Sequence, residues 1–89
     1  MPVISMFYGL IVMMYFFDTE RHHLPHIHVK YAEFTVVIEI QTLQILQGDL
    51  PANKLRLLLA WMEIHKDELM ANWELAKNGE ALFKIEPLK

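Results

Sequence analysis

The sequence contains no cysteine among its 89 residues. Disulfide bonds, cysteine-based zinc sites, iron–sulfur clusters and thiol catalysis are therefore excluded, and this composition is typical of proteins from a reducing cytoplasm. Glycine is also scarce, since the three glycines stand at positions 9, 48 and 79. Each lies where the hydrophobic periodicity changes, so the glycines mark turns between elements and not a flexible linker.

An excess of positive charge is missing as well. Eight Lys and Arg oppose eleven Asp and Glu, which leaves a formal net charge of −3. Proteins that hold nucleic acid through non-specific phosphate contacts usually have a basic excess, so nucleic acid is expected only as the substrate of a compact site. No glycine-rich phosphate loop or nucleophile elbow is present, so nucleotide-binding and α/β-hydrolase folds have no support.

The longest apolar run, residues 2–17, is too short for a membrane span. A spanning helix needs about 20 apolar residues, and Gly9 interrupts this run. The run also lacks the positively charged start and the cleavage site of a secretory signal. We therefore expect a cytoplasmic protein without a membrane segment.

Apolar residues are abundant, at 54% of the chain. The length predicts one domain over residues 1–89, and a domain of this size has little interior in which to bury apolar side chains. The surplus predicts that the protein forms a homo-oligomer, such as a dimer, or binds a partner protein.

The first half of the chain has the pattern of short β-strands. Leu10–Phe17 is apolar at every position, so we expect this strand to be covered on both faces. Runs of β-branched and aromatic residues predict an antiparallel meander of strands at Val3–Phe7, Leu10–Phe17, His26–Tyr31, Phe34–Gln41 and Leu43–Gln47.

The second half has the pattern of a helix. From Pro51 to Asn78, apolar side chains recur every three or four residues, and Gly79 supplies a stop. A straight helix of this length would measure about 40 Å, more than a short sheet covers. We therefore expect either a kink or break near residues 65–67 or an overhang that contacts a partner. Phe83–Glu86 is expected to return as an edge strand. The predicted fold is therefore α+β, a small antiparallel sheet of four or five strands followed by a long or kinked helix packed on it.

Four of the five histidines fall within seven residues, between Arg21 and Lys30. On a strand, His26 and His28 point to the same face, about 7 Å apart. Pro25 restricts the backbone that enters this strand. In a purely structural interpretation, this segment is a His-rich strand whose rings only cap backbone groups.

A pair of imidazoles on a rigid strand also allows three kinds of chemistry. The first is general acid and base catalysis by His26 and His28, which needs no metal. The second is a site for Zn²⁺ or another transition metal, which these two residues form together with His22 or His23 and a carboxylate. The third is an anion site for a phosphate or an acidic partner, to which Arg21 and Lys30 contribute.

His65 lies on the apolar stripe of the helix, and Glu68 follows it by one turn on the same side. Packing of the helix on the sheet is expected to bring both residues to the two imidazoles of the strand and to form one catalytic site. The alternative is a satisfied core histidine. Trp61 and Trp73 are predicted to anchor either the core or an interface. At an interface they would contact a substrate or a partner.

Four features together resemble a family of short prokaryotic proteins, the domain of unknown function 4160. They span nearly the whole chain, and their order and spacing agree with the family. The features are Met-Pro-Val-Ile-Ser-Met-Phe-Tyr-Gly (1–9), His22-x-x-Pro25-His26-x-His28, Trp61-x-x-x-His65-Lys66-Asp67-Glu68-Leu69 and Asn72-Trp73-Glu74.

The resemblance implies that the protein is a component of a two-gene module of toxin–antitoxin type. In this module the protein would be the toxin, and a cognate small protein would be encoded nearby. Three functions are open: hydrolysis of RNA by the histidine cluster without a metal, non-catalytic binding of the partner protein, or metal binding. The resemblance also implies that these residues occupy signature positions of the family: His22, Pro25, His26, His28, Trp61, His65, Glu68 and Trp73.

Overall fold

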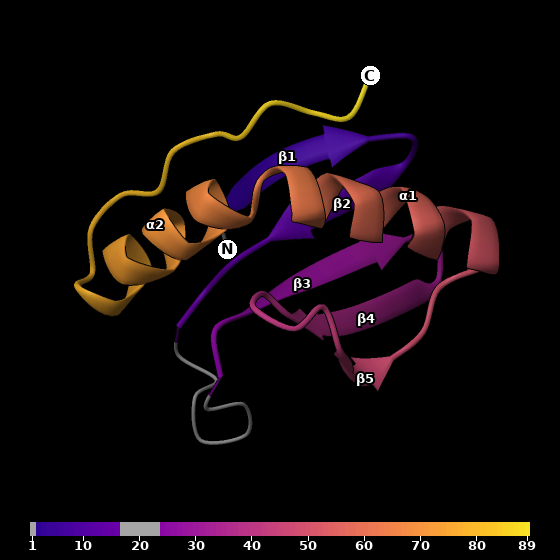
Figure 1. Cartoon of the computed structure of the whole chain (residues 1–89), viewed down its shortest axis with the longest axis horizontal. Coiled ribbons are helices and arrows are strands. Elements are labelled where there is room, and N and C mark those ends of the chain that lie inside the picture. The colour runs from indigo at the N-terminus through magenta and orange to yellow at the C-terminus, as the bar shows by residue number, and fades with distance from the viewer. Residues whose placement is uncertain (1, 17–23) are drawn as a thin grey trace.

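The computed structural model describes residues 2–16 and 24–89, and these form an α+β fold of five strands followed by two helices (Figure 1). The predicted fold class is confirmed. The elements are β1 (Val3–Phe7), β2 (Leu10–Met13), β3 (His26–Tyr31), β4 (Phe34–Glu39), β5 (Ile45–Gly48), α1 (Ala52–Ile64) and α2 (Lys66–Lys77).

The strands form one antiparallel sheet in the order β1-β2-β3-β4-β5. Tyr8 and Gly9 connect β1 to β2 with φ values of 50° and 82°. Two positive φ values are what a two-residue hairpin turn of the right twist requires. Gly48 ends β5 against its neighbour, because a Cβ at this position would lie 2.2 Å from the main-chain oxygen of Thr35.

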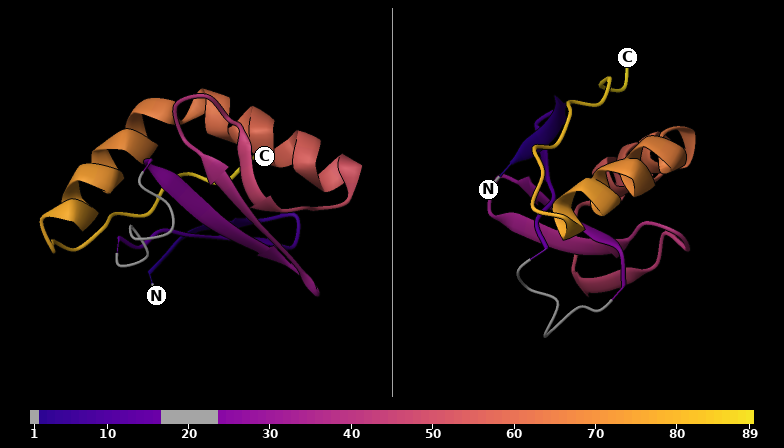
Figure 2. Two further views of the ribbon diagram at one scale, coloured as in Figure 1. Left: turned by 90° about the horizontal axis from the view of Figure 1, so that it is seen from below. Right: turned by 90° about the vertical axis from the view of Figure 1, so that its left-hand side faces the viewer.

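Both helices pack on the same face of the sheet (Figure 2). Trp61 of α1 contacts Phe7 of β1 with ring centroids 5.1 Å apart, and the apolar side chains between the two layers form the core. The other face carries no helix in the part of the chain that the structure describes. We expected the second strand to be covered on both faces, but helices cover it on one face only. Ile11 and Met13, on the other face, are half-buried.

The helix divides at His65, as its length predicts. The main-chain N–H of His65 donates to Trp61 at the end of α1, and its carbonyl accepts from Leu69 in α2. Asp67 and Glu68 lie in the first turn of α2, where negative charge interacts favourably with the helix dipole. The bend turns α2 around the end of the sheet, so its apolar side still faces the core (Figure 2).

Four strand limits differ from the prediction, since β5 also ends at Gly48, one residue beyond the predicted limit. β2 ends at Met13 and not at Phe17, and Met14 leaves the sheet while remaining buried. An apolar run does not distinguish a strand from a buried segment that has left the sheet. β4 ends at Glu39 and β5 begins at Ile45, both inside the predicted limits, because the chain turns between them.

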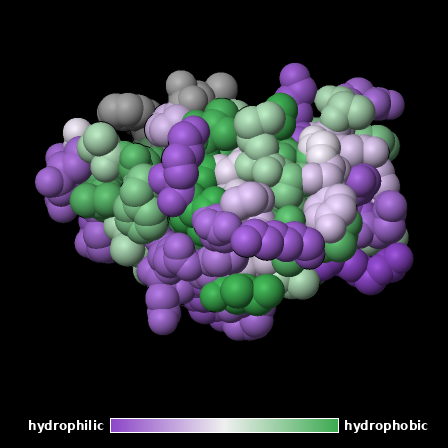
Figure 3. Space-filling view, turned by 90° about the horizontal axis from the view of Figure 1, so that it is seen from above, coloured by the Kyte–Doolittle hydropathy of each residue, from purple (hydrophilic) through white to green (hydrophobic). Residues whose placement is uncertain are grey.

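The C-terminal segment, residues 80–89, has no regular secondary structure and lies along β1 and the helices (Figure 1). The predicted edge strand Phe83–Glu86 is therefore wrong. Only Ile85 makes a main-chain hydrogen bond to β1, from its N–H to the carbonyl of Ile4 at 2.8 Å. On the face of the molecule seen in Figure 3, hydrophobic side chains are exposed between hydrophilic ones.

Two buried side chains fasten the C-terminal segment to the helices. The Asn72 amide donates to the carbonyl of Phe83 at 2.9 Å and accepts from its N–H at 3.0 Å. The Trp61 indole N–H donates to the carbonyl of Glu86 at 2.8 Å. Ile85 is buried between these two attachments.

Candidate functional site

Five rings gather where β2 leaves the sheet and β3 enters it. Tyr15 stacks on His28 with ring centroids 4.3 Å apart, and His28 meets His26 edge-on at 5.2 Å. His26 contacts Trp73 at 5.1 Å, and Trp73 contacts Phe16 at 5.4 Å. We call these five residues the ring cluster. The cluster connects β3 to α2 and to the segment that follows β2.

His26 is held in a fixed position within the ring cluster. It is 0% exposed, and its Nδ1 lies 2.7 Å from the carbonyl oxygen of Leu24. Because a carbonyl only accepts, Nδ1 carries a proton and donates it to Leu24. His26 is therefore closed to solvent and meets its surroundings only through the side chains packed against it, among them His28.

Two rows of side chains cross the face of the sheet opposite the helices. The register of β1, β2 and β3 defines the rows, since paired residues on antiparallel strands point to the same side. We call these six residues the open face: Met6, Ile11 and Lys30 in one row, and Val3, Met13 and His28 in the next.

The open face is apolar at four of its six positions, because only Lys30 and His28 are polar. Met6 is 62% exposed, Lys30 is exposed, and the other four are half-buried. Val37, which continues the second row on β4, is buried. A sheet face that meets water usually carries polar side chains. The open face is therefore more apolar than a sheet face in contact with water usually is.

Glu39 and Tyr15 are absent from the predicted site. Glu39 is buried and lies directly opposite His26 in the register of β3 and β4. Its carboxylate accepts a hydrogen bond from the Thr42 hydroxyl at 2.8 Å. A single acidic residue within a strongly β-forming run indicates a carboxylate that is buried and hydrogen-bonded. Tyr15 gives no such signal, since it stands among other apolar residues.

His65 forms a second pair at the junction of the two helices. Its Nδ1 lies 2.5 Å from the Glu68 carboxylate. Because the carboxylate accepts, Nδ1 carries the proton, and Glu68 holds the orientation of the ring. The ring also lies 5.5 Å from that of Trp61, which is a core anchor and fully buried. Along the helix axis, His65 is about 12 Å from Trp73, the residue that contacts His26 of β3.

The structure therefore joins His26 to His28 and joins His65 to Glu68. Among the described residues, no group of three or more His, Asp or Glu side chains gathers closely enough to hold a metal ion. Within that part of the chain, the four residues of the predicted catalytic site do not converge on one point.

Arg21, His22 and His23 lie outside the described residues. The anion site that includes Arg21 and the metal site that includes His22 or His23 therefore stay predictions. Of the two predicted tryptophan anchors, Trp73 belongs to the ring cluster and is almost fully buried.

The fold and its site define an α+β protein with two helices on one face of a five-stranded sheet and a histidine pair at the end of that sheet. Over residues 9–74 the sequence matches the family described as a domain of unknown function, DUF4160, and the chain belongs to this family. The match contains the ring cluster and the His65–Glu68 pair but not the C-terminal segment.

No curated protein and no solved structure matches the chain. In the ranges that the structure describes, no helix has the length and apolar character needed to cross a membrane.

Proposed function

We propose that this chain is one component of a prokaryotic two-gene module of toxin–antitoxin type and that it binds the cognate small protein through the open face. The module is what the resemblance to the family implies, and the apolar surface on β1 and β2 supports the binding. Removing apolar surface from water is the main favourable term in protein association. The uncovered apolar rows are the observation that carries the proposal.

The charges around the open face indicate the chemistry of the partner. Lys30 is exposed at the border of the apolar rows, and His28 lies beside it on the same strand and face. A partner that fits has an apolar patch bordered by an acidic side chain opposite Lys30. Such a rim charge mainly accelerates association and selects the orientation.

A lysine at the β1 end of the open face is expected to disrupt this complex. Met6→Lys places a charge in a surface that must lose water on binding, and we expect the dissociation constant to rise at least tenfold. Lysine is well tolerated on edge strands, so the fold is retained. Calorimetric titration of the purified chain with the protein of the neighbouring gene measures the change.

Ile64→Lys is the matched control, because Ile64 is 66% exposed and lies on the helical side of the molecule. It introduces the same charge at similar exposure, and we expect a dissociation constant within about twofold of wild type. Equal losses in both variants, or a loss only in Ile64→Lys, would contradict binding through the open face.

Hydrolysis of RNA is the second candidate function, and the contact between His26 and His28 favours it. The two rings touch, and the tautomer of His26 is set by Leu24. In this version His28 takes the proton of the RNA 2′-hydroxyl as its oxygen attacks the phosphate, and returns that proton to the departing 5′-oxygen. His26 positions His28. Lys30, on the same face, stabilises the negative charge that develops on the phosphate.

Cleavage of single-stranded RNA in the presence of EDTA tests this second candidate. His28→Ala is expected to reduce the rate by about 10²–10⁴-fold, the usual contribution of a general acid or base. His65→Ala, which changes the imidazole outside the ring cluster, is expected to leave the rate unchanged. Cleavage that survives His28→Ala, or that disappears in His65→Ala, would refute catalysis by the ring cluster.

A further inference from the structure

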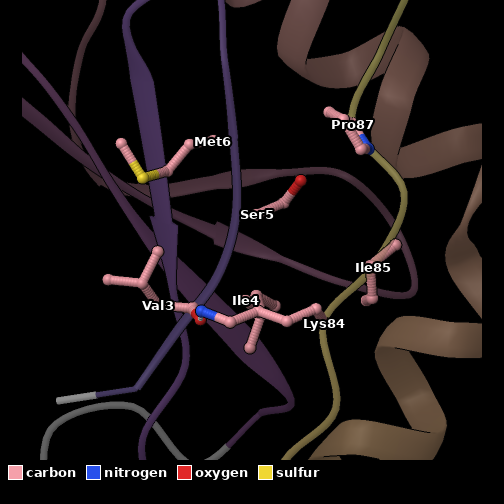
Figure 4. Close-up of a pocket in the computed structure, with 7 residues that line it drawn as sticks. All are labelled: Val3, Ile4, Ser5, Met6, Lys84, Ile85 and Pro87. Carbon is pink, nitrogen blue, oxygen red and sulfur yellow. Dashed lines mark hydrogen bonds between the residues drawn. The ribbon is translucent and has the colours of Figure 1, made fainter.

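A gap separates β1 from the C-terminal segment. It has a volume of about 240 Å³ and is lined by residues 3–6 of β1 and by Lys84, Ile85 and Pro87 (Figure 4). The walls are mainly apolar, and the gap is open to solvent at the edge of the sheet.

Ser5 places an unpaired polar group in this gap. The residue is only 5% exposed, and its hydroxyl points from β1 toward the C-terminal segment (Figure 4). Among the described residues, its Oγ is the one buried side-chain nitrogen or oxygen without a hydrogen-bond partner. Leaving a buried hydroxyl unpaired is unfavourable, so such a group points to a ligand that pairs with it.

Met6 presents both of its main-chain polar groups to the same gap. Phe7 and Leu10 flank the two-residue turn and form the hydrogen-bonded pair that closes the hairpin. The next pair, Met6 and Ile11, is then of the non-hydrogen-bonded kind, because the two kinds alternate. The N–H and C=O of Met6 therefore point away from β2 and toward the C-terminal segment.

Pro87 leaves the Met6 carbonyl without a donor from the C-terminal segment. The segment runs in the same direction as β1 (Figure 1), and the N–H of Ile85 donates to Ile4. In a parallel ladder the next donor stands two residues later, at Pro87, which has no N–H. No main-chain hydrogen bond from residues 80–89 to Met6 is found in the described chain.

We propose that this gap binds the main chain of an extended peptide segment from another protein, which adds to the edge of β1. The peptide donates an N–H to the Met6 carbonyl, accepts from the Met6 N–H and pairs with the Ser5 hydroxyl. Small apolar side chains of the peptide contact the walls. Sites that enclose whole small molecules measure about 300–1,000 Å³, so this smaller gap suits one or two residues of a longer chain.

A blocked dipeptide, N-acetyl-alanyl-alanine N-methylamide, is the probe, and the ¹⁵N-labelled full chain is observed by NMR. We expect saturable shifts of the Ser5, Met6 and Ile85 amide signals. Ser5→Ala is expected to weaken binding about two- to tenfold, the range for one neutral hydrogen bond. Pro87→Ala supplies the missing N–H to Met6, so the chain's own segment closes the gap and binding falls at least fivefold.

Three results would overturn the proposal. The first is identical shifts with 3-methylbutanol, which would show an apolar pocket without recognition of a main chain. The second is unchanged binding of the dipeptide in both variants. The third is a concentration-dependent shift of the same signals without any probe, because a second copy of the chain would then occupy the gap. None of these results depends on the partner of the open face, so the two proposals fail separately.

Discussion

Replacing Trp61 by alanine is expected to lower the free energy of unfolding by about 3–5 kcal/mol. Trp61 is fully buried, packs on Phe7 and donates its indole N–H to the carbonyl of Glu86. The variant loses the apolar contact between α1 and β1 and also the attachment of the C-terminal segment. Urea unfolding measures the change, with Trp73 as the remaining fluorescent reporter.

Trp61→Phe separates the two contributions of this side chain. Phenylalanine keeps most of the packing against Phe7 but has no N–H for Glu86, so we expect less than half of the loss seen in the alanine variant. A loss below about 1 kcal/mol in Trp61→Ala would contradict the central position of this residue in the core.

Asn72→Ala is expected to lower the free energy of unfolding by about 1–3 kcal/mol, because the N–H and the carbonyl of Phe83 lose their partner together. Asn72 is fully buried, so its amide replaces water for both groups. The C-terminal segment is expected to detach locally before the rest of the chain unfolds. Hydrogen exchange at the Ile85 amide, which is bonded to β1, measures this detachment.

Asn53→Ala is the matched control, since Asn53 is exposed in the first turn of α1. We expect its free energy of unfolding to stay within about 0.5 kcal/mol of wild type. Equal destabilisation by the two asparagine variants, or unchanged exchange at Ile85 in Asn72→Ala, would disprove the role of Asn72 as the attachment of the segment.

The sequence predicts the fold well where a local rule decides the structure. Gly9 lies in the first hairpin turn, and Gly48 ends the last strand at a position without room for a Cβ. The length of the helical stripe correctly predicts the break at His65. The C-terminal strand fails because Phe83–Glu86 has a strand pattern but only one residue of it bonds to β1.

The candidate site is predicted less completely, because its contacts depend on how the elements pack. The spacing of His26 and His28 places both rings on one side of β3, as the ring contact shows. The bend at the helix junction then directs Trp73, and not His65, to the ring of His26. Periodicity places residues on the face of a helix but does not give the position of that helix along the sheet.

Methyl NMR of the chain with ¹³C-labelled methionine tests the open face most directly. Met6 and Met13 lie on that face, whereas Met62 is buried in the core and Met70 is half-buried on α2. On addition of the protein of the neighbouring gene, the Met6 and Met13 signals are predicted to shift while those of Met62 and Met70 stay in place. Shifts at Met70 with unchanged signals at Met6 and Met13 would contradict binding through this face of the sheet.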